Sequence, residues 1–135
     1  MRMIVAVVAL LSGTVAQAQT IPLTCQGEFK IYRPSRTDAD VPAGSGSVDL
    51  ARKRFNSPVG NFNIATVSDG AAEIRDSFVD KTGRRLIVRG NFDRTSGKVW
   101  IMWLTEQAAH RFDTNQNAGA EMYASMLCGR ANRVF

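Results

Sequence analysis

Seven residues of this sequence carry side chains whose types and spacing suit ligand binding. A histidine, an arginine and a phenylalanine in a row offer an imidazole, a guanidinium and an aromatic ring, which fits an anionic or sugar-like group. A basic pair follows a predicted turn, and two tryptophans stand three positions apart in an apolar run. The candidates are His110, Arg111 and Phe112, Arg84 and Arg85, and Trp100 and Trp103. Any binding site is expected among them; the alternative is that they are solvated surface and core.

Catalytic chemistry finds little support in the sequence. His110 is the only histidine, no G-x-S-x-G motif occurs, and both cysteines are expected to be oxidised, so nucleophilic catalysis lacks its usual groups. No ligand spacing indicates a metal site, and no cofactor motif occurs. A pair of carboxylates stays open, because spacing in sequence does not report separation in space. We therefore expect a non-enzymatic protein, with a carboxylate-based hydrolase without a metal as the alternative.

The segment 90–98 (GNFDRTSGK) invites comparison with a phosphate-binding loop. Six residues separate Gly90 from Gly97, where the motif G-x-x-x-x-G-K-[ST] has four, and Val99 stands where Ser or Thr is required. In a turn, by contrast, Asp93 can accept hydrogen bonds from the turn amides, and Gly97 supplies a positive φ. We predict a turn over residues 93–97.

The segment after this turn, residues 99–104 (VWIMWL), is apolar on both faces of a predicted strand. A strand with one solvated face should alternate between apolar and polar residues, so this one is expected to be covered on both sides. We predict that the segment 105–128 packs over the outer face. The alternative is that one tryptophan lines an apolar cavity or an exposed patch that binds a partner.

The N-terminus has the pattern of a secretory signal peptide. Arg2 precedes an apolar run over residues 4–11, and Ala16-Gln17-Ala18 has the small-x-small pattern of a cleavage site. The apolar run is too short to span a membrane. We predict a cleavable signal peptide over residues 1–18 and an exported, soluble mature chain in the periplasm or outside the cell, with no transmembrane segment.

The two cysteines predict one disulfide. Cys25 and Cys128 lie near the two ends of the predicted mature chain, and an even count in an exported protein indicates pairing. Such a bond requires the first and last elements of the fold to be neighbours.

Short β-rich segments alternate with turn signals every ten to fifteen residues, including Asp69-Gly70. This pattern predicts a single all-β domain over residues 19–135, a small antiparallel barrel or sandwich of seven or eight strands whose terminal strands share the disulfide. We expect a flexible loop over residues 33–47, a short helix over 105–112 and a strand over 120–128. A helix over 120–128 is the alternative, because its apolar residues also fit a helical stripe.

Charge bears on the partner. The chain has 17 basic and 12 acidic residues, and loss of Arg2 with the signal peptide leaves 16 against 12, a formal +4. This charge favours an anionic envelope component or a small ligand, whereas export argues against nucleic acid. The segment 96–103 (SGKVWIMW) resembles the serine-glycine turn and following aromatics of small exported barrels that inhibit lysozyme. An inhibitor of that basic enzyme should present an acidic face, so we assign no family from it. We expect an envelope protein that binds a ligand or partner, or else a structural protein with no ligand.

Overall fold

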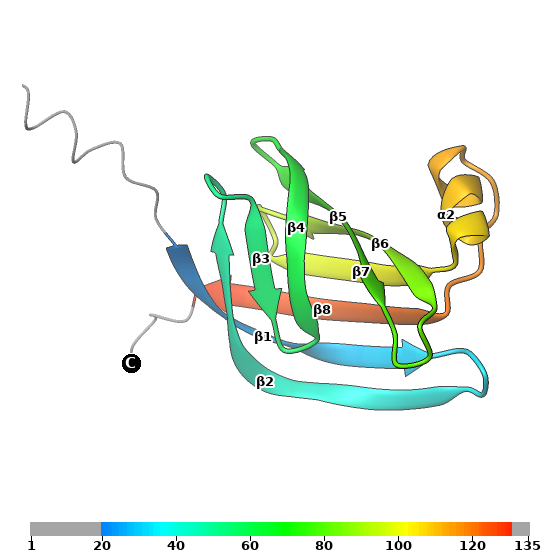
Figure 1. Cartoon of the computed structure of the whole chain (residues 1–135). Helices are drawn as coiled ribbons and strands as arrows, with labels where there is room; N and C mark the ends of the chain where they lie inside the picture. Colours follow the sequence, from blue (N-terminus) through cyan, green and yellow to red (C-terminus); the bar gives the residue numbers. More distant parts are fainter. Residues whose placement is uncertain (1–19, 131–135) are drawn as a thin grey trace, which may run out of the picture.

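The computed structural model describes residues 20–130, and the predicted signal peptide lies outside the described residues. Within them, eight strands close an antiparallel barrel in sequence order, and one helix lies between the last two strands (Figure 1). The elements are β1 (Thr20–Ile31), β2 (Thr37–Asp49), β3 (Arg54–Ser57), β4 (Gly60–Val67), β5 (Ala71–Val79), β6 (Arg85–Asp93), β7 (Lys98–Leu104), α2 (Glu106–Asp113) and β8 (Met122–Arg130). The all-β fold expected from the sequence is confirmed, and of the two predicted architectures, barrel or sandwich, it is the barrel. None of the helical structure in residues 20–130 is both long enough and apolar enough to cross a membrane.

The predicted turns form as expected. In the turn before β7, the Asp93 carboxylate accepts hydrogen bonds from the backbone N–H groups of Thr95 (2.9 Å) and Ser96 (3.2 Å). These hydrogen bonds hold the pKa of Asp93 below its usual value, and the bond from Thr95 is the largest cause. Gly97 has a φ of 81° and donates its N–H to the Asp93 carbonyl. The segment 93–97 is therefore a hairpin turn and not a phosphate loop.

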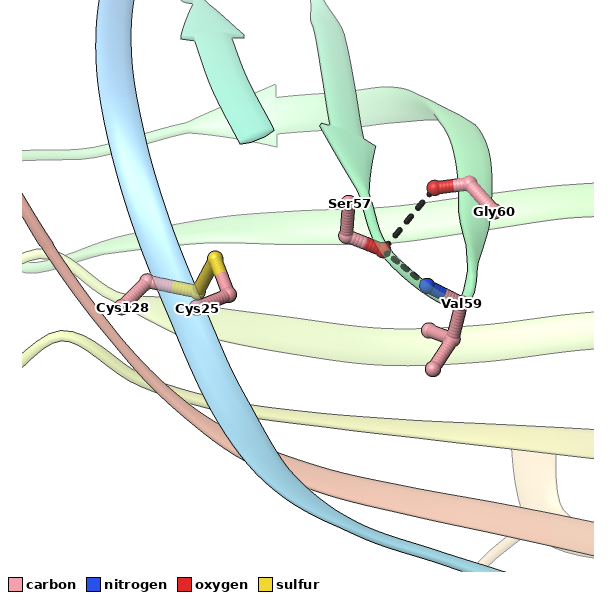
Figure 2. The surroundings of a disulfide bond; sticks show 5 residues. All are labelled: Cys25, Ser57, Val59, Gly60 and Cys128. Carbon is pink, nitrogen blue, oxygen red and sulfur yellow. Dashed lines mark hydrogen bonds between the residues drawn. A yellow bond between two sulfur atoms is a disulfide. The ribbon is translucent and has the colours of Figure 1, made fainter. Parts of the chain in front are cut away.

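The barrel closes between its first and last strands. β1 and β8 run antiparallel side by side, and Cys25 and Cys128 are direct partners in their register. The predicted disulfide joins these two residues. Figure 2 shows it on β1 near the turn between β3 and β4, where the Ser57 hydroxyl accepts from Val59 N–H and donates to the Gly60 carbonyl. The prediction of a strand over 120–128 is confirmed by β8, which begins at Met122.

The middle of the barrel is filled by aromatic side chains. The ring of Trp103 packs edge-on against Phe29 and Phe62, with ring centres 5.6 and 5.9 Å apart. Phe55 and Phe92 form another edge-on pair at 5.5 Å. All of these rings except that of Phe29 are buried, and Phe55 is fully so. Successive side chains of a strand point to opposite faces, so the alternation of apolar and polar residues in the sequence places these rings on the inner face.

The predicted flexible loop over 33–47 is wrong. The connection after β1 covers only residues 32–36, and β2 begins at Thr37 and continues for 13 residues. Few of its side chains are buried, because over most of its length β2 pairs with β1 and only its end, from Ser47, also pairs with β3. Pro42 lies in a register shift between Val41 and Gly44, where a missing N–H is tolerated. Pairing with β1, rather than burial of its own side chains, makes this segment a strand.

The helix α2 lies against the outer wall of the barrel, on β6 and β7 (Figure 1). Thr105 caps it, accepting a hydrogen bond from Ala108 N–H (3.1 Å). Ala109 of the helix and Leu104 at the end of β7 are both buried, but neither belongs to the barrel core. The outer face of residues 99–104 is thus covered in part by the following segment, as predicted.

Candidate functional site

The two ends of the barrel differ in chemistry. One end is formed by the turns 50–53, 68–70 and 94–97, and we call it the Arg94 end. The opposite end is formed by the loop 32–36, the turn 80–84 and α2, and we call it the helix end. Each end holds cavities lined by arginines, so each is a candidate binding site.

A cavity of about 340 Å³ opens at the Arg94 end. Its apolar walls come from four strands and from the residue that follows β2, and four of the six residues belong to the buried barrel core. These residues are Ile21, Leu23, Val48, Leu50, Ala72 and Phe92. The turn before β7 and the end of β8 supply the polar part: Arg94, Thr95, Ser96, Gly97, Cys128, Gly129 and Arg130. The cavity is apolar below and basic at its rim.

Arg94 is fixed in place at this rim by the neighbouring turn. Its guanidinium donates a hydrogen bond to the Ser68 carbonyl, and its backbone N–H donates to the Gly70 carbonyl at 2.8 Å. Among the described residues that line the cavity are two arginines and no carboxylate. A guanidinium held at the mouth of an apolar cavity can pair with the charged head of a ligand whose apolar part lies inside.

The helix end is organised by a buried carboxylate. The side chain of Glu121 is only 5% exposed, and its two oxygens accept hydrogen bonds from Arg84 Nη1 at 3.0 Å and Arg33 Nη1 at 3.1 Å. Arg84 also reaches Asp80 at 3.3 Å. The pKa of Asp80 is lowered, first by its hydrogen bond with the Thr82 side chain and also by those from Arg84. This end therefore holds two arginines close together on one carboxylate.

A second ionic cluster ties the end of α2 to the barrel wall. Asp113 accepts two hydrogen bonds from Arg89, at 3.0 and 2.9 Å, and one from Arg75 at 3.3 Å. The Arg89 hydrogen bond is the first cause of a lowered pKa at Asp113. Beside this cluster, Phe112 packs edge-on against Trp100 with ring centres 6.2 Å apart. These contacts fix the helix on the wall.

The structure brings together only some of the residues that the sequence singled out. Arg84 and Arg111 line two cavities at the helix end that share Arg33 and Thr105. His110 is exposed on α2. Arg85 is exposed at the start of β6 and lines neither the cavity at the Arg94 end nor those at the helix end.

The aromatic candidates take structural positions. Phe112 and Trp100 contact each other on the outer wall, and both line a cavity of about 210 Å³. Trp103 is a buried core residue that also lines a cavity of about 200 Å³ with Phe62 and the partly exposed Phe78. The alternative expectation, that one tryptophan lines a cavity, therefore fits Trp103, although this cavity is small.

Sequence reasoning did not select Arg94, Arg130, Arg33 or Glu121. Their signal lies in their positions, since each stands at or just beyond the end of a strand, where side chains surround the mouth of a barrel. That signal needs strand boundaries accurate to one or two residues. The misassigned start of β2 left Arg33 inside a long loop, so its proximity to Arg84 could not be inferred.

A hydrolase of the kind kept as the alternative needs two carboxylates facing one cleft. Each of these five cavities is lined by at most one carboxylate of the described residues. The resolved carboxyl pKa shifts are downward, at Asp80, Asp93 and Asp113, whereas a general acid requires an upward one. No group of three metal-ligating side chains occurs within residues 20–130.

Comparison of the chain with models of protein families, with curated proteins and with solved structures found no match.

Proposed function

We propose that this protein is an exported, non-enzymatic binding protein that takes a small amphipathic anion into the cavity at the Arg94 end. The observation that carries the proposal is the cavity itself, about 340 Å³ in volume, with an apolar wall and two arginines at the rim. Eight strands is the size at which an antiparallel barrel is either filled by side chains or holds one small ligand. Here aromatic side chains fill the middle and leave room for a ligand at one mouth.

The chemistry of the cavity selects the class of ligand. Ile21 and Leu50 are half-buried and Phe92 is buried, so they offer apolar surface that a hydrocarbon chain would cover. Arg94 and Arg130 would pair with a carboxylate or phosphate head at the mouth. A medium-chain fatty acid or a similar amphiphile satisfies both parts.

Two features support export. The sequence of residues 1–18 has the pattern of a signal peptide. The Cys25–Cys128 disulfide belongs to an oxidising compartment, because thiols are kept reduced in the cytosol. An envelope location would also expose the protein to membrane-derived amphiphiles.

Titration calorimetry with octanoate tests the proposal. We expect saturable binding at one site, weakened about fivefold to tenfold in Arg94→Gln, which removes the anchored rim charge. Octanol, which lacks the charge, should bind more weakly than octanoate. The matched control is Arg52→Gln: this arginine belongs to the same end but does not line the cavity.

Two results would contradict the proposal. Equal losses in Arg94→Gln and Arg52→Gln would mean that net charge, and not the cavity, attracts the anion. No heat from octanoate at millimolar concentration would favour the alternative of a structural protein without a ligand.

A further inference from the structure

The helix end contains a buried carboxylate whose position is fixed by the backbone on both sides. The backbone N–H of Glu121 donates to the Trp103 carbonyl at 2.8 Å, and the backbone carbonyl of Glu121 accepts from Tyr32 N–H at 2.9 Å. These bonds place it between the ends of β7 and β1, just before β8 begins. Burial of a carboxylate is costly unless cations compensate it, and two guanidinium groups do so here.

The consequence for the arginines is that two like charges are held near each other. Arg33 and Arg84 each donate one Nη1–H to a separate oxygen of Glu121. Their side chains remain 61% and 51% exposed, and a guanidinium has five N–H donors, so most of their donors face solvent. Glu121 thus positions a pair of guanidinium groups with free donors, although their charges repel each other.

Both arginines line a cleft. A cavity of about 400 Å³ is lined by Arg33, Pro34, Arg84, Thr105 and Glu121. A second cavity of about 190 Å³ shares Arg33 and Thr105 and adds Arg111, Gln107, Ala108 and Gly119. The lining of the two cavities together contains three arginines and one carboxylate, and Asp80 pairs with Arg84 from outside the lining, which leaves a formal charge of +1 (three minus two).

From this arrangement we propose that the cleft at the helix end is a second binding site, for a phosphate monoester, on Arg33 and Arg84 with Arg111 in reach of a bound group. A phosphate monoester carries close to two negative charges at neutral pH and has three terminal oxygens. Guanidinium forks match these oxygens with paired hydrogen bonds. The net positive charge of the cleft favours such a ligand, and this site is independent of the cavity at the Arg94 end.

The first experiment is a titration of the folded chain with inorganic phosphate at constant ionic strength, followed by calorimetry. We expect saturable binding that Arg84→Gln and Arg33→Gln each weaken about tenfold, because each removes one donor fork. The matched control is Arg85→Gln, the next residue in sequence, which is exposed and lines neither cavity. It removes the same charge and should change the affinity less than twofold.

Loss of Arg84 or Arg33 also removes a partner of Glu121, so a third variant separates binding from folding. Arg111 forms no salt bridge with another residue in the described part of the chain, and it lines the adjoining cavity. Arg111→Gln should leave the melting temperature unchanged and weaken phosphate binding about threefold. Equal effects of Arg84→Gln and Arg85→Gln, or no saturable phosphate binding by the wild type, would overturn the proposal.

Two further binding experiments, with vesicles of different composition, identify the source of the phosphate group. Vesicles with phosphatidic acid present a monoester at a membrane surface, and vesicles with phosphatidylglycerol present a diester of lower charge. Arg84-dependent binding to the first but not to the second indicates a lipid headgroup. Binding of inorganic phosphate with no vesicle binding indicates a soluble phosphate compound, and both results support the site.

Discussion

Asp113 shows how single residues fix the helix on the barrel. Arg89, whose side chain is only 13% exposed, donates two hydrogen bonds to this carboxylate, and Arg75 adds a third. Together they keep the pKa of Asp113 below its usual value. Because the folded state favours the ionised carboxylate, Asp113 stabilises the protein wherever it is ionised.

Asp113→Asn should therefore lower the free energy of unfolding at pH 7 by about 1 kcal/mol, since the group is partly exposed. A depressed folded-state pKa means that the stabilisation is fully present above the unfolded value near 3.8 and is lost as the pH falls through the lower folded value. The difference between wild type and variant should therefore shrink as the pH falls below about 3.8. Urea unfolding at a series of pH values measures it.

The matched control for this prediction is Asp38→Asn. Its ion pair with Arg36 is exposed on both sides, at 63% and 55%, so the change should cost less than about 0.5 kcal/mol at every pH. Equal costs at pH 7 for the two variants, or an Asp113→Asn deficit that does not shrink as the pH falls below about 3.8, would contradict this account of the cluster.

At the same scale, the sequence predicted part of the candidate sites. Two of the candidates chosen from the sequence, Arg84 and Arg111, each line a cavity at the helix end, because arginines near the ends of elements tend to be exposed. The sequence did not indicate the carboxylates that pair with the arginines of the two ionic clusters. Glu121 lies 37 residues from Arg84, and Asp113 lies 24 residues from Arg89. Such pairs become visible only when the strand registers are known.

At the scale of elements, the turn before β7 is limited by the strand beside it. A Cβ atom at Gly97 would lie 2.1 Å from the backbone oxygen of Cys128, and the φ of 81° is itself unfavourable for other residues. Gly83, in the turn between β5 and β6, has a similar φ of 85° but nothing within 4 Å of such an atom. Both glycines have a positive φ, but only Gly97 also lies too close to a neighbouring strand to accept a Cβ atom.

Gly83→Ala should thus cost about 1 kcal/mol of stability, and Gly97→Ala should cost about 3 kcal/mol or more, because β8 must also move. Thermal or urea unfolding of the two variants measures the difference. Equal costs would show that contact with β8 does not constrain this turn.

Elements with strong local signals were predicted well from the sequence, and β2 was not. The hairpin turns at Asp69-Gly70 and at residues 93–97 carry residues whose side chains or φ preferences specify a turn. The segment from Thr37 to Gly46 has one proline, two glycines and exposed polar residues, a composition that is typical of a loop. Its strand structure depends on pairing with β1, and pairing between distant residues is not encoded in local composition.

At the scale of the whole molecule, the disulfide joins the two strands that close the barrel. Cys25 and Cys128 are separated by 103 residues, so the bond removes much of the freedom of the unfolded chain. The double variant Cys25→Ala/Cys128→Ala should lose about 4 kcal/mol of stability in the chain-entropy description. Urea unfolding of the variant beside the oxidised wild type gives the value. A loss below about 1 kcal/mol would mean that the pairing of β1 with β8 closes the barrel unaided.

The central claim is that the cavity at the Arg94 end binds an amphipathic anion, and the most direct test is an amide NMR titration with octanoate. We predict saturable shifts at Ile21, Leu50, Phe92 and Arg94, with little change around Trp103 or in α2. Ala72→Leu places extra methyl groups at the wall of the cavity and should abolish these shifts. Because Ala72 is fully buried, the change should also cost about 1–3 kcal/mol of stability, and a native-like amide spectrum shows that the variant is folded. Shifts confined to the helix end, or undiminished shifts in Ala72→Leu, would contradict the claim.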